Sequence, residues 1–135
     1  MRRRKFRFLA TTLVVAAGLA AASGAGLAES DAIYPNPKEP EMTPRLQLGV
    51  MNYAVYCAFC HGKAASGSES GPTFIHRIYQ PGHHTDGHFF AAAKNGTIAH
   101  HWKFGDMPPV EEANDTQLEL IVEYIRAVQR ANGPF

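Results

Sequence analysis

Apolar residues recur at the spacing of an α-helix near the middle of the chain. Their intervals of four, three and four residues place them on one helical face: Leu46, Val50, Tyr53 and Cys57. Thr43 precedes this run and suits an N-cap, and Pro44 suits the first helical turn. The pattern predicts a helix over about residues 44–57.

A second apolar stripe lies near the C-terminus. Its members fall on one helical face: Leu118, Ile121, Val122, Ile125 and Val128. Asn114 or Asp115 is expected to open this helix, and Thr116 with Glu119 matches the spacing of a capping box. The sequence Asn-Gly-Pro at 132–134 is expected to end it.

The region between these two segments carries weaker signals. Residues 62–82 are rich in loop-forming residues. A short helix is expected to begin at Thr85 or Asp86 and to stop at Asn95-Gly96. No segment of normal strand length alternates apolar and polar residues, so the fold is predicted to be all-α.

The first 28 residues have the pattern of an export signal. Several cations precede an apolar run from Phe8 to Ala22, and Gly-Leu-Ala at 26–28 suits a signal peptidase. We interpret residues 1–28 as a cleaved signal peptide. The alternative is an uncleaved membrane anchor, but the second half of the apolar stretch is made of Ala, Gly and Ser.

Cleavage would leave a chain long enough for one small domain. Residues 29–43 are rich in proline and lack a helical period, so they are expected to form an N-terminal arm, either a tail or a wrapping segment. Residues 44–135 are expected to form the domain. The signal contains five of the 13 basic residues and none of the 12 acidic ones, which leaves a formal charge of −4. This charge argues against binding to nucleic acid.

The two cysteines lie in the sequence Cys57-Ala-Phe-Cys60-His61. A disulfide across two residues would stabilise the domain little, and a thioredoxin-like dithiol needs a βαβ pattern that is not evident. A structural zinc site would need further ligands, which other histidines could supply. Covalent haem attachment explains more: the cysteines form thioethers, and the adjacent histidine ligates the iron.

The order of motifs resembles that of the small class I cytochromes c of bacteria, over essentially the whole chain after residue 28. The matching segments are Cys57-x-x-Cys60-His61-Gly62, Gly71-Pro72-x-Phe74, Gly105-x-Met107-Pro108-Pro109, and Tyr124 in the last helix. The resemblance implies a cytochrome c-like fold, with N- and C-terminal helices packed across one covalently bound haem c and loop-rich segments between. It also implies a close crossing of these two helices, which suits Gly49 as a contact without a side chain.

The iron needs a second axial ligand opposite His61. Met107 lies 46 residues further on, in a Gly-x-Met-Pro-Pro segment whose prolines exclude helix and stiffen the backbone. Its soft thioether favours Fe(II), so His/Met ligation raises the reduction potential. We predict Met107 as this ligand, with His100 and His101 as alternatives. Three aromatic residues are candidates to line the haem: Phe74, Phe89 and Phe90.

Histidines are concentrated in one part of the sequence. Five fall within 19 residues: His83, His84, His88, His100 and His101. One interpretation is a second metal site for copper or zinc. Its ligands would come from the group at residues 83–88 and from the pair at residues 100–101. The other is a solvated surface, with one histidine bonding a haem propionate. No spacing rule in the sequence selects the metal site.

These features predict an exported, periplasmic electron carrier with no catalytic residues of its own. The expected redox partners are a dehydrogenase or respiratory complex and an oxidase or reductase; a membrane is a partner only if the signal is uncleaved. The alternatives are a haem subunit docked to an oxidoreductase, a haem enzyme or ligand sensor with an open iron position, and a protein in which haem and histidine-bound copper exchange electrons. The acidic composition favours a partner with a neutral, basic or apolar contact surface.

Overall fold

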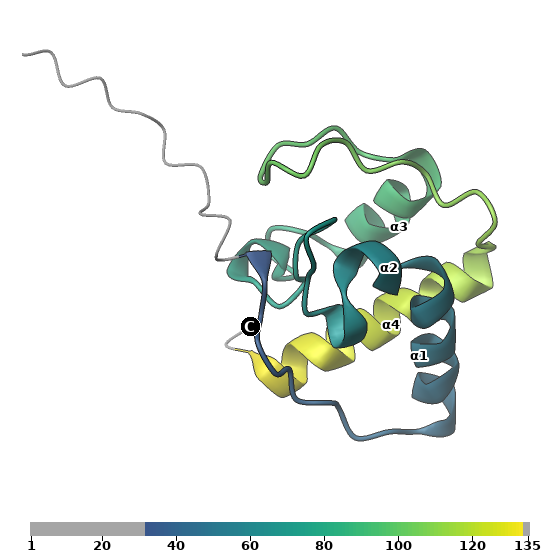
Figure 1. The fold of residues 1–135 in the computed structure, drawn as a ribbon. Helices are drawn as coiled ribbons and strands as arrows, with labels where there is room; N and C mark the ends of the chain where they lie inside the picture. The colour runs from purple at the N-terminus through teal and green to yellow at the C-terminus, as the bar shows by residue number, and fades with distance from the viewer. Residues whose placement is uncertain (1–31, 134–135) are drawn as a thin grey trace, which may run out of the picture.

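The structure, a computed structural model, describes residues 32–133 and is helical over this range (Figure 1). The α-helices are α1 (Pro44–Tyr56), α2 (Ala58–His61), α3 (Asp86–Asn95) and α4 (Asp115–Asn132), with 3-10 turns η2 (Lys63–Ala65) and η3 (Arg77–Tyr79). The described residues contain no strand beyond isolated bridges, which pair Ser68 with Gly71 and Thr97 with Met107. The prediction of an all-α fold is confirmed.

Helices α1 and α4 pack against each other in close contact (Figure 1). At Gly49 of α1, a Cβ atom would lie 2.5 Å from the carbonyl oxygen of Leu120 and 2.9 Å from the Cβ of Tyr124. Any larger residue would therefore force the two helices apart. One turn further along α1, the rings of Tyr53 and Tyr124 meet edge to face with centroids 5.2 Å apart. The close helix crossing that the resemblance implies is present.

Helix α4 begins after Asn114, one of the two residues predicted to open it, but its capping box differs from the predicted one. The Asn114 side chain accepts from the backbone N–H of Gln117, and the Gln117 side chain accepts from that of Asn114, both at 3.0 Å. The box built from Thr116 and Glu119 is therefore wrong, because both residues already lie inside the helix. Asn and Gln satisfy the same reciprocal pattern two residues earlier.

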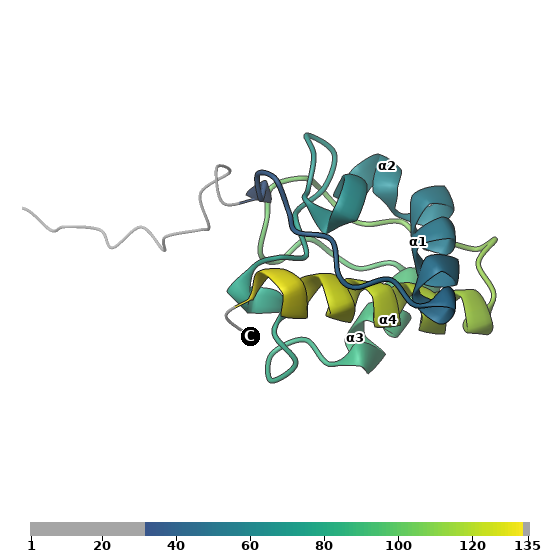
Figure 2. The ribbon, with the colours of Figure 1, turned by 90° about the horizontal axis from the view of Figure 1, so that it is seen from below.

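Helix α4 lies between α1 and α2 on one side and α3 on the other (Figure 2). The predicted apolar stripe is buried, with every member no more than 8 % exposed: Leu118, Ile121, Val122, Ile125 and Val128. Burial extends round to other faces of the helix, including Tyr124 and Gln129. Helix α4 is therefore the central element of the domain. Several of its apolar side chains face the cavity described below.

Helix α3 begins and ends where the sequence predicts. Thr85 is its N-cap, and the backbone N–H of Thr85 donates to Nδ1 of His88 at 3.1 Å. The helix ends at Asn95, and Gly96 follows with a φ of 72°, a conformation that favours glycine.

The described part of the arm, residues 32–43, wraps along the domain. The backbone N–H of Tyr34 donates to the carbonyl oxygen of Ser66 at 2.7 Å. Further on, the Asn132 side chain accepts from the backbone N–H of Lys38 at 2.6 Å and donates to its carbonyl oxygen at 2.7 Å. The predicted signal peptide, residues 1–28, lies outside the described residues. Among residues 32–133, none of the helices has the length and apolar character needed to span a bilayer.

Candidate functional site

Three of the four predicted site residues line one cavity of about 640 Å³: Cys57, His61 and Met107. The fourth, Cys60, lies on the same short helix α2 as His61. Apolar side chains from several elements complete much of the wall: Phe74, Phe89, Leu118, Ile121, Val122 and Ile125. Phe90, also predicted to line the haem, packs against the core without entering this wall. The cavity has the size and apolar lining of a site for a large organic ligand.

The imidazole of His61 is oriented by a backbone carbonyl. His61 is the last residue of α2, and its Nδ1 lies 2.9 Å from the carbonyl oxygen of Pro72. Because a carbonyl only accepts, Nδ1 donates and Nε2 is left unprotonated. Burial lowers the pKa of His61, although the hydrogen bond to Pro72 acts in the opposite direction. The ring, stacked on Phe74 at 4.2 Å between centroids, has the neutral, fixed form of a metal-ligating histidine.

The two cysteines lie on either side of the start of α2. Cys57 is the residue at which α1 ends and α2 begins, and both thiols are free. Burial, together with the neighbouring Cys60, raises the pKa of the Cys57 thiol to about 12. A redox dithiol reacts through its thiolate, so this environment opposes the thioredoxin-like interpretation. The Ser68 hydroxyl donates to the Cys60 carbonyl oxygen at 2.6 Å, which ties α2 to the following loop.

The backbone of Met107 is fixed to the segment that follows α3. Thr97 and Met107 exchange two N–H to carbonyl hydrogen bonds, each of 2.9 Å. Gly96 makes this approach possible, since a Cβ at that position would lie 2.6 Å from the Met107 carbonyl oxygen. The loop 97–107 is thereby closed at its base, and Met107 lines the cavity together with His61.

The cavity and its surroundings fit a covalently attached haem. Two free thiols at C-x-x-C spacing can form thioethers, a neutral imidazole follows them, and apolar side chains form much of the wall. An all-α fold with such a site defines a c-type cytochrome. The sequence model of the family described as cytochrome c oxidase, cbb3-type, subunit III matches residues 44–125, and the chain belongs to this family. No curated protein gives a significant match to the chain.

Membership in this family defines the cofactor and the general function. Cytochromes of this kind contain haem c, an iron porphyrin attached through thioethers, and Cys57, Cys60 and His61 have the spacing that this attachment requires. Haem-based electron transfer is therefore the general function of the chain, and redox proteins are its class of partner.

Arg126 is a buried residue that the sequence analysis misses. Its side chain is 8 % exposed, and its Nε donates to the Asp86 carboxylate at 2.6 Å. Its two terminal nitrogens donate to backbone carbonyls, that of Tyr79 at 2.7 Å and that of His84. Through these contacts α4 holds the chain from the end of η3 to the start of α3, which contributes Tyr79, His83 and His84 to the cavity wall.

Replacing Arg126 by methionine is expected to lower the free energy of unfolding by about 3 kcal/mol, since it leaves the His84 carbonyl oxygen and the buried side-chain oxygen of Gln129 without a donor and breaks an ion pair. Asp86 is 70 % exposed and can be rehydrated, so the two acceptors that lose their donor account for much of the loss. Denaturant unfolding of the haem-loaded protein measures the effect. Arg130→Met is the control, because Arg130 is exposed one turn further along α4. Equal losses in both variants would contradict this role for Arg126.

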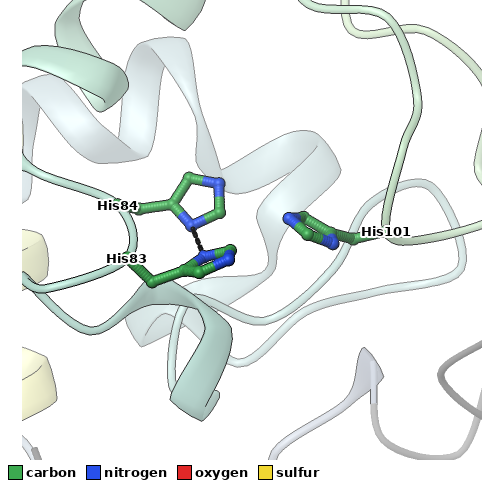
Figure 3. Close-up of side chains that lie close together, drawn as sticks. All are labelled: His83, His84 and His101. Atoms are coloured by element: carbon green, nitrogen blue, oxygen red, sulfur yellow. Dashed lines mark hydrogen bonds between the residues drawn. The ribbon is translucent and has the colours of Figure 1, made fainter.

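The five clustered histidines all line the haem cavity, and ring contacts with centroids 4.3 to 6.2 Å apart connect them, but their potential ligand atoms are not all close together. In three of them, potential ligand atoms lie within 4.8 Å of one another: His83, His84 and His101 (Figure 3). The other two have local partners. His88 accepts from the Thr85 backbone N–H at the start of α3, and Nδ1 of His100 lies 2.7 Å from the Ile98 carbonyl oxygen. The structure thus narrows the sequence-based grouping to three residues.

Proposed function

We propose that the chain is an exported monohaem cytochrome that carries single electrons between redox partner proteins, with His61 and Met107 as its two iron ligands. The observation that carries this proposal is that Cys57, His61 and Met107 line the same cavity although Met107 comes 50 residues after Cys57 in the sequence. The Pro72 carbonyl orients the first ligand, and the hydrogen bonds to Thr97 hold the backbone of the second.

When bound, haem c supplies an iron that exchanges one electron between its ferric and ferrous forms. The residues of the chain control this exchange in three ways. The Met107 thioether favours the ferrous form and so raises the reduction potential. The two backbone hydrogen bonds between Thr97 and Met107 restrict the movement of Met107, and so do Pro108 and Pro109, which follow it. The apolar wall keeps water away, so a change of charge requires little solvent reorganisation.

Exposed apolar side chains beside the attachment cysteines supply a contact surface for redox partners. They are Leu48, Met51, Val55 and Phe59, which are 50 to 88 % exposed. The first three recur at helical spacing along α1, and Phe59 lies between the two cysteines. Exposed apolar surface of this kind marks an interaction site. A weak apolar contact next to the cofactor also suits a carrier that must bind and release two different partners.

Replacing Phe59 by lysine is expected to slow electron delivery to a partner by about tenfold, which corresponds to about 1.4 kcal/mol of lost contact free energy. The measurement is the rate at which membranes of the same organism oxidise the reduced protein. The control is Ile33→Lys, which adds the same charge at an exposed apolar residue of the N-terminal arm. An unchanged rate for the Phe59 variant, or an equal loss in both, would remove this surface from the proposal.

We further propose that the protein acts in the periplasm after removal of residues 1–28. The support is the sequence pattern of that segment, five cations followed by an apolar run and a small-residue cleavage site. N-terminal sequencing of the periplasmic protein is expected to begin at Glu29. A chain that begins at Met1 in the membrane fraction would contradict cleavage.

A second candidate function is that of a haem subunit docked permanently to an oxidoreductase. The description of the matching family, which names an oxidase subunit, favours this candidate, and the exposed apolar residues of α1 and α2 would then be covered by the larger enzyme. Purification from native membranes distinguishes the two functions. A fixed ratio to one oxidoreductase supports the subunit, and recovery as a separate protein supports the carrier.

A further inference from the structure

Two loops bring three imidazoles together at one side of the haem cavity. His83 and His84 come from the turn between η3 and α3, and His101 comes from the loop 97–107. In Figure 3 the rings of His83 and His84 lie side by side, and the ring of His101 faces them across a gap. The centroid of the His101 ring lies 5.4 Å from that of His83 and 5.3 Å from that of His84.

The spacing of the nitrogen atoms is close to that of a tetrahedral metal site. Nitrogen ligands at 2.0–2.1 Å from a tetrahedral zinc ion lie about 3.3 Å apart. The potential ligand atoms, one from each of His83, His84 and His101, lie within 4.8 Å of one another. Metal binding would require rotation of these side chains to close the remaining difference, and His83 is exposed while His84 and His101 are half-buried.

The surroundings also supply the hydrogen bond that metal-ligating histidines usually make with their second nitrogen. The carbonyl oxygen of Ile78 lies 2.9 Å from Nδ1 of His83 and 2.5 Å from Nδ1 of His84. A ring that donates to this carbonyl through Nδ1 has an unprotonated Nε2 available for a metal. Burial is the main reason why the pKa values of His84 and His101 are lowered, and neighbouring imidazoles lower both further. The neutral, metal-binding form of His84 and His101 is therefore favoured.

Both loops are held in place by the domain. The Arg126 guanidinium donates to the His84 carbonyl oxygen, which fixes the first loop to α4. Within the second loop, the backbone N–H of Ala99 donates to the Asp106 carboxylate at 2.9 Å. The Trp102 indole N–H donates to the Tyr79 hydroxyl at 3.1 Å and so connects the second loop to η3. The three histidines therefore approach each other on anchored segments.

We propose that His83, His84 and His101 together bind one divalent transition-metal ion, separate from the haem iron, at the side of the haem cavity. A set of three imidazoles selects zinc or copper over magnesium or calcium, which prefer oxygen ligands. Three protein ligands leave a fourth position to water, as in open zinc sites. This site goes beyond the proposed electron transfer, and it requires that His101 is not itself a ligand of the haem iron.

Zinc titration of the haem-loaded protein, purified without a histidine tag, tests the proposal. Zn²⁺ is the probe because it has no redox chemistry with the haem, and Mg²⁺ is the comparison ion. Isothermal calorimetry is expected to show one zinc ion per chain and no binding of magnesium. The variants H83Q and H101Q are each expected to weaken zinc binding by at least about tenfold, since even outer-shell substitutions at metal sites cost 10–100-fold.

The matched control is H100Q, which changes the neighbouring histidine outside the group. Its zinc affinity is expected to stay close to that of the wild type. The visible absorption spectrum of every variant is expected to match the wild type, which shows that the domain is folded and the haem ligands are unchanged. Absence of zinc binding, an equal loss in H100Q and H101Q, or a haem spectrum altered by H83Q or H101Q would overturn the proposal. The last result would assign these histidines to the haem instead.

Discussion

Replacing both Cys57 and Cys60 by serine is expected to abolish covalent haem attachment. The only thiols of the chain are these two, and a thioether to a haem vinyl group needs a thiol. The mature protein should carry the mass of one haem in the wild type and none in the double variant, as measured by mass spectrometry of the denatured chain. The single variants, each of which keeps one thiol, are the controls and should retain a singly attached haem at lower yield.

The same substitution is expected to destabilise the domain. The cavity of about 640 Å³ is lined by apolar side chains of α3 and α4, and without haem this surface has no partner. A domain of about 100 residues has too small a core to tolerate such a loss. We expect the double variant to be largely unfolded in circular dichroism at 25 °C. A folded, haem-containing double variant would contradict attachment through this pair.

Replacing Met107 by alanine is expected to lower the reduction potential by on the order of 100 mV, because axial ligation sets haem potentials over a range of about 0.8 V. Loss of the soft thioether removes the preference for the ferrous form. Potentiometric titration of the purified protein measures the shift. Met51→Ala is the control, since Met51 is 64 % exposed on α1. An unchanged potential in the Met107 variant would transfer the role to His100 or His101.

The helices could be predicted from sequence because their end signals are local. Thr43 with Pro44, and Thr85 with the later Asn95-Gly96, define their helices through contacts within one turn. The box at the start of α4 shows where this reasoning fails. Asn114 with Gln117 and Thr116 with Glu119 satisfy the same rule, and the sequence does not show which pair lies at the boundary.

The haem attachment segment could also be predicted from a local pattern, since its cysteines and histidine lie within five consecutive residues. The partners that orient these residues could not. Pro72 reaches His61 and Thr97 reaches Met107 across loops whose paths no local pattern predicts. Gly96 is a weak exception: a glycine at a helix end is expected, but its contact with the Met107 backbone is not.

Arg126 and the histidine group show the same limit for long-range contacts. A charged residue on a helix is usually exposed, and the partners that bury Arg126 lie 40 to 47 residues earlier in the chain. The sequence indicates five neighbouring histidines but does not select His83, His84 and His101 from them. That selection depends on how two loops meet, which is a property of the whole fold.

The central claim is that His61 and Met107 together ligate one covalently attached haem that carries single electrons. The most direct test is the visible and far-red absorption spectrum of the oxidised and reduced protein, beside that of its Met107→Ala variant. The account predicts a low-spin haem with a methionine-to-iron charge-transfer band in the oxidised wild type, which the variant loses. A wild-type spectrum without this band that is also unaffected by Met107→Ala would contradict it, and would place a histidine on the iron or leave the position open.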